Sequence, residues 1–357
     1  MNREKILVAM SGGVDSSVAA FLLKEQGYDC VGVTMKLFDP DKQPHSTQSS
    51  CGSGEERNDA ARIAAQLGIP FEICDYSRKF ERHVIDYFIK TYIEGGTPNP
   101  CVECNRTMKF GKLYDAAQRL GCSKIATGHY ATVTQDADGR WQLCAASDES
   151  KDQTYVLWSL TQEQLSRTLF PLASLRKSEI REIALAQGFC NADRSDSQDI
   201  CFIPDGDYVS FIQNRTGESF PCGNFVDLNG NILGQHQGLI RYTIGQRKGL
   251  GIAFGKPTYV CAKNVVDNTV ILGENDDLFR RELTAHSINL IAVESIPSPI
   301  RVQAKVRYSA KAAPATAEQI APDKLHLVFD EPQRAISTGQ SVVLYDGNTV
   351  IGGGIID

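Results

Sequence analysis

A run of glycine and hydroxyl residues near the N-terminus has the composition of a phosphate-binding loop. The chain there reads Ser11-Gly12-Gly13-Val14-Asp15-Ser16-Ser17. Glycine at two positions lets the backbone turn so that several N–H groups converge on one anion, and the serines add hydroxyl donors. Asp15 would repel a phosphate unless a cation lies between them, so it indicates Mg²⁺. The alternative interpretation is a glycine–serine turn that only caps a helix.

Three cysteines could carry sulfur chemistry. Cys101 and Cys104 follow Gly95-Gly96-Thr97-Pro98-Asn99-Pro100, which predicts a loop because glycine and proline interrupt helices and strands. The pair could be half of a zinc site, a redox pair or a nucleophile, but the other cysteines do not supply a second ligand pair with similar spacing. A thiolate near a helix start can accept or pass on sulfur, which favours a nucleophile. Cys201, with polar residues before it and apolar residues after it, resembles a cysteine at the rim of a site.

Apolar segments around the glycine loop predict a parallel sheet. Ile6 to Ala9 reads as a strand, a helix follows the loop, and Val31 to Met35 and Phe71 to Cys74 read as two further strands. Strands that alternate with helices favour a parallel sheet with both faces covered. Ligands of such sheets bind at the carboxyl ends of the strands, so Ala9 to Ser17 and Met35 should line one crevice.

A later strand ends in Ala126-Thr127-Gly128-His129-Tyr130 and should reach the same crevice. Gly128 would let a flat ligand such as adenine approach closely, and His129 would follow it into the site. A satisfied structural histidine is the alternative for His129. Further on, Lys151-Asp152-Gln153 opens a short apolar helix, where a solvated cap is the alternative.

The pattern changes at about Pro204, where short alternating runs and many glycines replace the helices. Turn signals such as Asp346-Gly347-Asn348 separate the last strands, which favours a small barrel or sandwich. We therefore predict an α/β chain with a parallel-sheet domain at residues 1–204, a small mixed central domain at 205–282 and a C-terminal β-barrel at 283–357. The length of 357 residues agrees with two or three domains.

The composition excludes some classes of protein. The formal net charge of −6 argues against an indiscriminate nucleic-acid coat, but basic stretches around Arg241 and Arg301 to Lys311 could still hold RNA. No segment has the length of a membrane span, and the first residues lack the apolar core of a signal peptide. We therefore expect a cytoplasmic protein whose eleven cysteines are mostly reduced.

The glycine loop lacks the Gly-Lys-Ser/Thr ending of common nucleoside triphosphatases and is similar to the S-G-G-x-D-S loop of PP-loop ATP pyrophosphatases. The chain as a whole resembles the tRNA-specific 2-thiouridylase family. The matching motifs are Ser11 to Ser16, Thr97 to Asn105, Ala126 to Tyr130, Lys151 to Gln153, Ser197 to Phe202, Thr243 to Gly251, and Arg307-Tyr308. The resemblance implies an N-terminal adenine-nucleotide α-hydrolase-like (PP-loop) domain and ATP-dependent 2-thiolation of the wobble uridine of tRNA.

The resemblance also implies roles for single residues. ATP would bind over Ala9, Met10, Ser11, Gly12, Gly13, Val14, Asp15 and Ser16, with Met35 and Gly128 near the adenine and Mg²⁺ at Asp15. The target base would lie among Asn99, Pro100 and Cys101, after leaving the anticodon stack. The tRNA contacts would be His129, Lys151, Asp152, Gln153, Arg307, Tyr308 and Gln340.

For the sulfur, the resemblance implies that Cys201 carries a persulfide delivered by a sulfur-relay protein or a cysteine desulfurase. Cys104 occupies the position of the family's nucleophile, and Cys101 stands where some members carry an aspartate. The persulfide either attacks the activated ring directly or is freed as sulfide while Cys104 forms a disulfide with Cys201. The competing interpretations are another PP-loop enzyme, such as an amidating ligase or a lysidine-type synthetase, and a non-catalytic tRNA-binding protein.

Overall fold

A computed structural model describes residues 3–38, 54–194, 200–252 and 255–357. The chain divides into two compact units. The first unit comprises Met1–Ile85, Pro100–Gly206 and Asn348–Ile351, and the second comprises Asp86–Asn99, Asp207–Gly347 and Gly352–Asp357. The predicted loop from Asp39 to Gly54, except Gly54 itself, lies outside the described residues, as do Ser197, Gln198 and Asp199.

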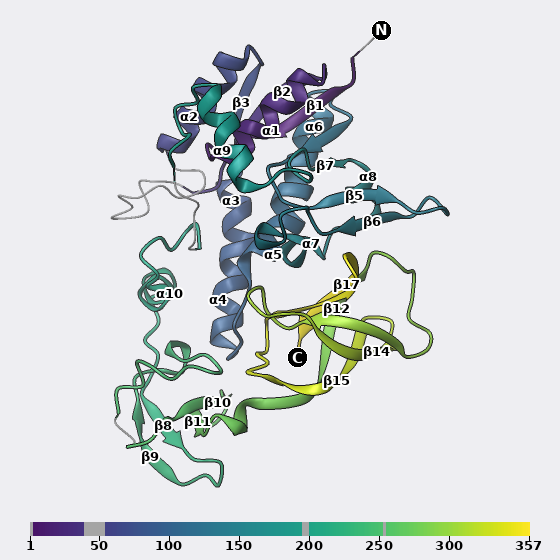
Figure 1. Cartoon of the computed structure of the whole chain (residues 1–357). Helices are drawn as coiled ribbons and strands as arrows, with labels where there is room; N and C mark the ends of the chain where they lie inside the picture. The colour runs from purple at the N-terminus through teal and green to yellow at the C-terminus, as the bar shows by residue number, and fades with distance from the viewer. Residues whose placement is uncertain (1–2, 39–53, 195–199, 253–254) are drawn as a thin grey trace. The chain divides into compact units, whose positions relative to one another are not determined.

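The first unit contains the predicted parallel sheet (Figure 1). Its strands lie in the order β3-β2-β1-β4-β7 and all pair in parallel. They are β1 (Lys5–Ala9), β2 (Asp29–Lys36), β3 (Phe71–Asp75), β4 (Lys124–Ala126) and β7 (Thr168–Leu169). The chain builds the sheet outward from β1 to β3 and then returns to place β4 on the other side of β1. The crevice of such a sheet opens at this reversal, at the carboxyl ends of β1 and β4.

Helices cover both faces of the sheet because alternate residues of β1 point to opposite sides. Ile6 and Val8 belong to a core shared with α1 (Val14–Glu25), α2 (Gly54–Leu67) and α9 (Lys177–Ala186). Leu7 belongs to a second core with α6 (Leu113–Arg119). The remaining elements of this unit are α3 (Ser77–Phe80), the π-helix η2 (Glu81–Ile85), β5 (Thr132–Gln135), β6 (Trp141–Cys144), the 3-10 helix η4 (Glu149–Lys151), α7 (Thr154–Leu157) and α8 (Gln162–Ser166).

The two cysteines of the C-x-x-C motif lie on a helix. The prediction of a loop through residue 105 is wrong for its last part, because α5 (Pro100–Cys104) is helical and continues into the π-helix η3 (Asn105–Lys112). Proline is well tolerated at the first position of a helix, where its missing N–H would have no intrahelical partner. Pro100 therefore starts this helix rather than excluding it.

The second unit holds the central sheet and the barrel. The central sheet has the order β10-β11-β8-β9 and combines antiparallel pairs with a parallel β11–β8 pair. Its strands are β8 (Gly223–Val226), β9 (Ile232–His236), β10 (Tyr259–Asn264) and β11 (Thr269–Gly273), and β10 and β11 form an antiparallel hairpin. Phe225, Val260 and Val270 form its core. Nearby, α4 (Asp86–Ile93) and α10 (Tyr208–Thr216) meet through Tyr92 and Tyr208, whose rings stack at 4.6 Å. The 3-10 helices η5 (Leu239–Arg241) and η6 (Asp276–Leu278) complete this part.

The C-terminal strands form the predicted barrel. Six of them run in the order β12-β15-β14-β13-β16-β17, and β17 closes the ring by pairing with β12 (Figure 1). They are β12 (Phe279–Leu290), β13 (Ile300–Lys305), β14 (Ala313–Ala321), β15 (Lys324–Arg334), β16 (Ser341–Asp346) and β17 (Thr349–Ile356). Closure leaves no exposed sheet edge, and alternate buried residues such as Leu325, Leu327 and Phe329 fill the interior. Among the described residues, no helix is long and apolar enough to cross a membrane.

Candidate functional site

The glycine loop joins the end of β1 to the first turn of α1. Gly12 has φ +88°, and a Cβ on it would lie 2.2 Å from the Glu56 carbonyl oxygen, so only glycine fits there. The serine side chains fold the loop: Ser16 and Ser17 donate to the Gly13 carbonyl at 2.9 and 3.0 Å. These contacts hold the start of α1, whose free N–H groups and positive end suit an anion.

A segment after α9 braces this loop. Asn191 is buried, and its Nδ2 donates to the Gly12 carbonyl at 2.7 Å and to Ser17 Oγ at 3.0 Å. Arg194 pairs with Asp59 of α2 at 2.7 Å. Sequence reasoning missed both residues because more than 130 positions separate them from their partners.

Asp15, the carboxylate of the loop, is paired with a lysine. Its two oxygens accept from Lys177 Nζ at 2.7 and 2.9 Å, and Tyr130 Oη donates to Oδ1 at 2.8 Å. Lys177 is the first residue of α9, and its own N–H donates to Asp148 at 3.0 Å. No group of three His, Cys, Asp or Glu side chains suited to a metal exists in the part of the chain that the structure describes. The cation that faces Asp15 in this structure is the Lys177 ammonium.

Other members of the predicted ATP set serve the fold. Met10 is buried, its N–H donates to the Val33 carbonyl, and its carbonyl accepts from Thr34 Oγ1. A Cβ on Gly128 would lie 2.8 Å from the backbone of Asp15 and Ser16. The missing side chain thus lets the segment after β4 pack against the start of α1, which is a different reason for glycine from an approaching adenine. Met35 and Ala9 are half-buried at the strand ends.

The thiol pair lies at the start of the helical segment α5–η3. Cys101 is exposed, Cys104 is 9 % exposed, and neither forms a disulfide. Residues three apart share a helix face, so the two thiols lie on one side of α5. Although the residue as a whole is exposed, protein atoms packed around its sulfur raise the pKa of the Cys101 thiol, and the charge of Lys109 acts in the opposite direction.

His129 is enclosed rather than presented to solvent. It is 7 % exposed, and its ring packs against Phe110 and Phe170 with centroids 5.9 and 6.0 Å away. Nε2 lies 3.2 Å from Lys109 Nζ and Nδ1 lies 2.7 Å from Thr127 Oγ1. Burial, followed by the Lys109 charge, holds the pKa of His129 well below its usual range. A direct tRNA contact by this ring would have to displace one of these hydrogen bonds.

Cys201 is half-buried, forms no disulfide and belongs to the same unit as Cys104. The next residue, Phe202, is buried, and its ring meets Phe80 edge-on at 5.7 Å. Phe80 in turn contacts Phe38 at 6.1 Å. These aromatic rings anchor the segment that carries Cys201. A reaction that joins the Cys201 and Cys104 thiols stays a prediction.

Hydrogen bonds through Tyr130 connect the Lys151-Asp152-Gln153 segment to the glycine loop that contains Asp15. Gln153 exchanges two hydrogen bonds with the Tyr130 backbone, at 3.0 Å through its side chain and 2.9 Å through its N–H. Asp152 accepts from Thr154 Oγ1 at 2.6 Å. Because Tyr130 also donates to Asp15, the predicted tRNA segment and the predicted phosphate loop share one residue.

The predicted tRNA residues of the C-terminal part have different surroundings. Tyr308 is 48 % exposed. Arg307 donates to the Arg334 carbonyl at 2.8 Å. Gln340 donates through Nε2 to the Thr97 carbonyl at 2.8 Å, so its side chain holds the segment that leads to Asn99.

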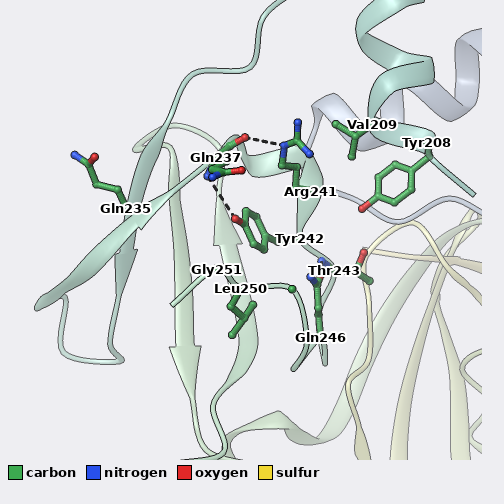
Figure 2. Close-up of a pocket in the computed structure, with 11 residues that line it drawn as sticks. Tyr208, Val209, Gln235, Gln237, Arg241, Tyr242, Thr243, Gln246, Leu250 and Gly251 are labelled. Atoms are coloured by element: carbon green, nitrogen blue, oxygen red, sulfur yellow. Dashed lines mark hydrogen bonds between the residues drawn. The ribbon is translucent and has the colours of Figure 1, made fainter. Parts of the chain in front are cut away.

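The second unit contains a cavity of about 580 Å³ beside the central sheet (Figure 2). Its lining combines polar and apolar surface and includes Tyr208, Gln237, Arg241, Tyr242, Thr243 and Gln246. Arg241 Nε donates to the Gln237 carbonyl at 3.0 Å, as Figure 2 shows. That contact holds the exposed guanidinium at the cavity, where it can attract an anion.

The parallel sheet and its glycine–serine loop define an adenine-nucleotide α-hydrolase-like protein, the class that includes the PP-loop enzymes. Family models match nearly the whole chain: "tRNA methyl transferase HUP domain" at residues 4–205, "tRNA methyl transferase PRC-barrel domain" at 209–274 and "Aminomethyltransferase beta-barrel domain" at 280–356. The chain belongs to the tRNA-specific 2-thiouridylase family. It is 50 % identical to "tRNA-specific 2-thiouridylase MnmA" of Clostridioides difficile, with 100 % of this chain and 99 % of the relative covered.

Two further relatives carry the same name. The protein of Carboxydothermus hydrogenoformans is 49 % identical over 100 % of this chain and 98 % of its own length. The protein of Acetivibrio thermocellus is 47 % identical over 100 % of both chains. The family resemblance stated from the motifs is thereby confirmed.

Proposed function

We propose that this protein uses ATP to replace the 2-oxygen of the wobble uridine of tRNA by sulfur. The observation that carries the proposal is its match to 2-thiouridylases, which runs at about half identity over the complete chain. The geometry of the first unit agrees with it, because a glycine–serine loop and two thiols that form no disulfide occur in one unit. An amidating ligase of the same fold would not need the thiols.

In the first step, the 2-oxygen of uridine attacks the α-phosphorus of ATP, and the bond to pyrophosphate breaks. Backbone N–H groups of the Gly12–Gly13 turn and the start of α1 would bind the phosphates. Mg²⁺, when bound with ATP, would neutralise phosphate charge and take Asp15 as a ligand. The approach of that ion would require Lys177 to leave Asp15, and the released ammonium could then pair with a phosphate oxygen.

In the second step, sulfur replaces the adenylated oxygen, and AMP leaves. Cys201 would carry a persulfide made by a donor protein, a sulfur-relay protein or a cysteine desulfurase. Its terminal sulfur either binds C2 directly or departs as sulfide and then binds C2. Either way Cys104 attacks the inner sulfur of Cys201, the S–S bond of the persulfide breaks, and a Cys104–Cys201 disulfide forms. A thiol reductant then restores both thiols.

The remaining predicted residues would hold the tRNA. Lys151, Arg307 and Tyr308 supply two cations and one exposed ring, which suit phosphates and a stacked base. The central segment at residues 205–282 would add contacts from Arg241 and its cavity. Asn99, Pro100 and Cys101 would surround the flipped uridine next to the thiol pair.

The test measures two products from unmodified tRNA, ATP, Mg²⁺ and a persulfide source. We expect Cys104→Ser and Cys201→Ser to abolish 2-thiouridine, measured by mass spectrometry of tRNA nucleosides, while pyrophosphate is still released. Cys144→Ser is the matched control, because Cys144 is a half-buried free cysteine of the same unit that the proposal does not use. Thiolation that survives both substitutions would contradict the roles of the two thiols, and pyrophosphate release without any 2-thiouridine from the unsubstituted protein would favour an amidating ligase. A folded protein that releases no pyrophosphate would favour a non-catalytic tRNA-binding protein.

A further inference from the structure

Lys109 is placed towards the cysteines by an irregular helix. It lies in the π-helix η3, which begins immediately after Cys104. In an α-helix residues four apart share a face, whereas the i→i+5 hydrogen bonds of a π-helix bring residues five apart together. Cys104 and Lys109 are five residues apart, so the π-helical turn moves the lysine towards the face that carries the thiols.

His129 fixes the end of the Lys109 side chain. An ammonium only donates hydrogen bonds, so the Nε2 atom at 3.2 Å from Lys109 Nζ must be the acceptor of a neutral imidazole. Nδ1 then carries the proton and donates to Thr127 Oγ1 at 2.7 Å. The low pKa of His129 agrees with this tautomer. Phe110 and Phe170 prevent the ring from turning, because they pack against it.

The charge held in this way acts on Cys101. Lys109 is the group whose charge favours the thiolate of Cys101 against the cost of burial. Arg106, the other cation early in η3, is paired with Glu103 at 2.7 Å. Thiolates, not thiols, are the nucleophiles of sulfur transfer, so a cation beside such a pair lowers the cost of forming the reactive species.

We propose that Lys109 is the residue whose charge stabilises a thiolate at Cys101 in the sulfur-transfer site, and that His129 is the positioning residue that holds the lysine there. This inference rests on the proposed function. It assigns His129 a task inside the protein, and the contact of His129 with tRNA stays a prediction. It also assigns a role to the π-helical turn, because a regular α-helix would direct residue 109 away from Cys104.

The test measures how fast iodoacetamide alkylates Cys101 between pH 7 and 11, followed by peptide mass spectrometry without ATP or tRNA. We expect Lys109→Met and Lys109→Gln to raise the midpoint of the pH profile by about one pH unit, and Lys109→Arg to preserve it. His129→Leu should raise the midpoint as well, whereas His129→Gln retains an acceptor and should restore it. Lys112→Met is the control, because Lys112 lies on the same π-helix but pairs with Asp115 at 3.0 Å.

An unchanged midpoint in folded Lys109→Met and Lys109→Gln would overturn the inference, as would an equal shift in Lys112→Met. Circular dichroism identifies any variant that does not fold. If one of Lys109→Met and Lys109→Gln does not fold, the alkylation midpoint of the other one decides the test. Thiolation of tRNA by the unsubstituted protein is measured separately. If the unsubstituted protein forms no 2-thiouridine, the proposed function is contradicted. If the alkylation midpoint of Cys101 does not change in the Lys109 variants, only the role of Lys109 is contradicted.

Discussion

Lys177 Nζ lies 2.7 Å from one carboxylate oxygen of Asp15 and 2.9 Å from the other, across 162 residues of sequence. The pair is partly buried, with the lysine side chain 12 % and the aspartate side chain 31 % exposed. The Lys177 ammonium pairs with the Asp15 carboxylate, which in the proposed site would otherwise face the phosphates of a nucleotide. Under the proposed function, binding of ATP with Mg²⁺ would rearrange this pair.

We predict that Lys177→Met weakens ATP binding about tenfold, because the variant lacks the ammonium that would pair with a phosphate oxygen once Mg²⁺ has taken Asp15. It should also lower the free energy of unfolding by about 1–3 kcal/mol, since a partly buried charged acceptor loses its donor. Calorimetric titration with a non-hydrolysable ATP analogue measures the first effect, and denaturant unfolding measures the second.

The double variant Asp15→Asn/Lys177→Met separates the two effects. It should regain most of the stability, because no charge is left unpaired, but it should not regain tight ATP binding. Lys124→Met, which removes a lysine paired with Glu4 at the surface of the same unit, is the control. Tight ATP binding by Lys177→Met would contradict this account of the Asp15–Lys177 pair.

We predict opposite outcomes for alanine at the two glycines of the loop. Gly12→Ala should lower the free energy of unfolding by about 2 kcal/mol or more, because φ is +88° and the new Cβ would overlap the Glu56 carbonyl. Gly13→Ala should leave the unfolding midpoint nearly unchanged, because Gly13 has φ −81° and the nearest atom to a new Cβ is 3.4 Å away. Equal unfolding midpoints for the two variants would show that the packing of α2 against Gly12 is not essential.

From the buried Lys263 ammonium we predict that the free energy of unfolding depends on pH. Burial lowers the pKa of this lysine from 10.5 to about 8, and its Nζ has no hydrogen-bond partner among the described residues. Between pH 8 and 10.5 the unfolded chain binds more protons than the folded one, so the free energy of unfolding rises with pH in this window. Below it, the folded protein carries a penalty of about 3 kcal/mol.

Lys263→Met removes that penalty. The variant should be more stable than the unsubstituted protein at pH 7, and the difference should vanish above pH 10.5. Denaturant unfolding at pH 7, 9 and 11 measures it. Lys256→Met is the control, because Lys256 is exposed and pairs with Glu274 at 2.6 Å. A stability difference that is the same at all three pH values would show that Lys263 titrates normally.

The phosphate loop and the C-terminal barrel could be predicted because their signals are local. Gly12 and Gly13 lie between an apolar strand and a helix, and short alternating runs with turn residues indicate the barrel strands. The partners of the loop could not be predicted in this way. Lys177, Asn191 and Arg194 come from a distant helix and the segment after it, and no pattern in the sequence joins them to Asp15 or Gly12.

The thiol site shows where local rules mislead. Glycines and prolines before Cys101 predicted a loop, but Pro100 begins a helix. The π-helical turn that places Lys109 has no sequence signal in a single chain. Gln340 was predicted to contact tRNA from the family motif, and its hydrogen bond to the Thr97 carbonyl became visible only in three dimensions.

The central claim is that the 2-oxygen of the wobble uridine is adenylated and then replaced by sulfur. The direct measurement uses tRNA with ¹⁸O at that oxygen, together with the protein, ATP, Mg²⁺ and a persulfide source, followed by mass spectrometry of the products. The account predicts that the label appears in the phosphate of AMP, in an amount equal to the 2-thiouridine formed. Label found in water, or retained in the uridine while ATP is consumed, would contradict it.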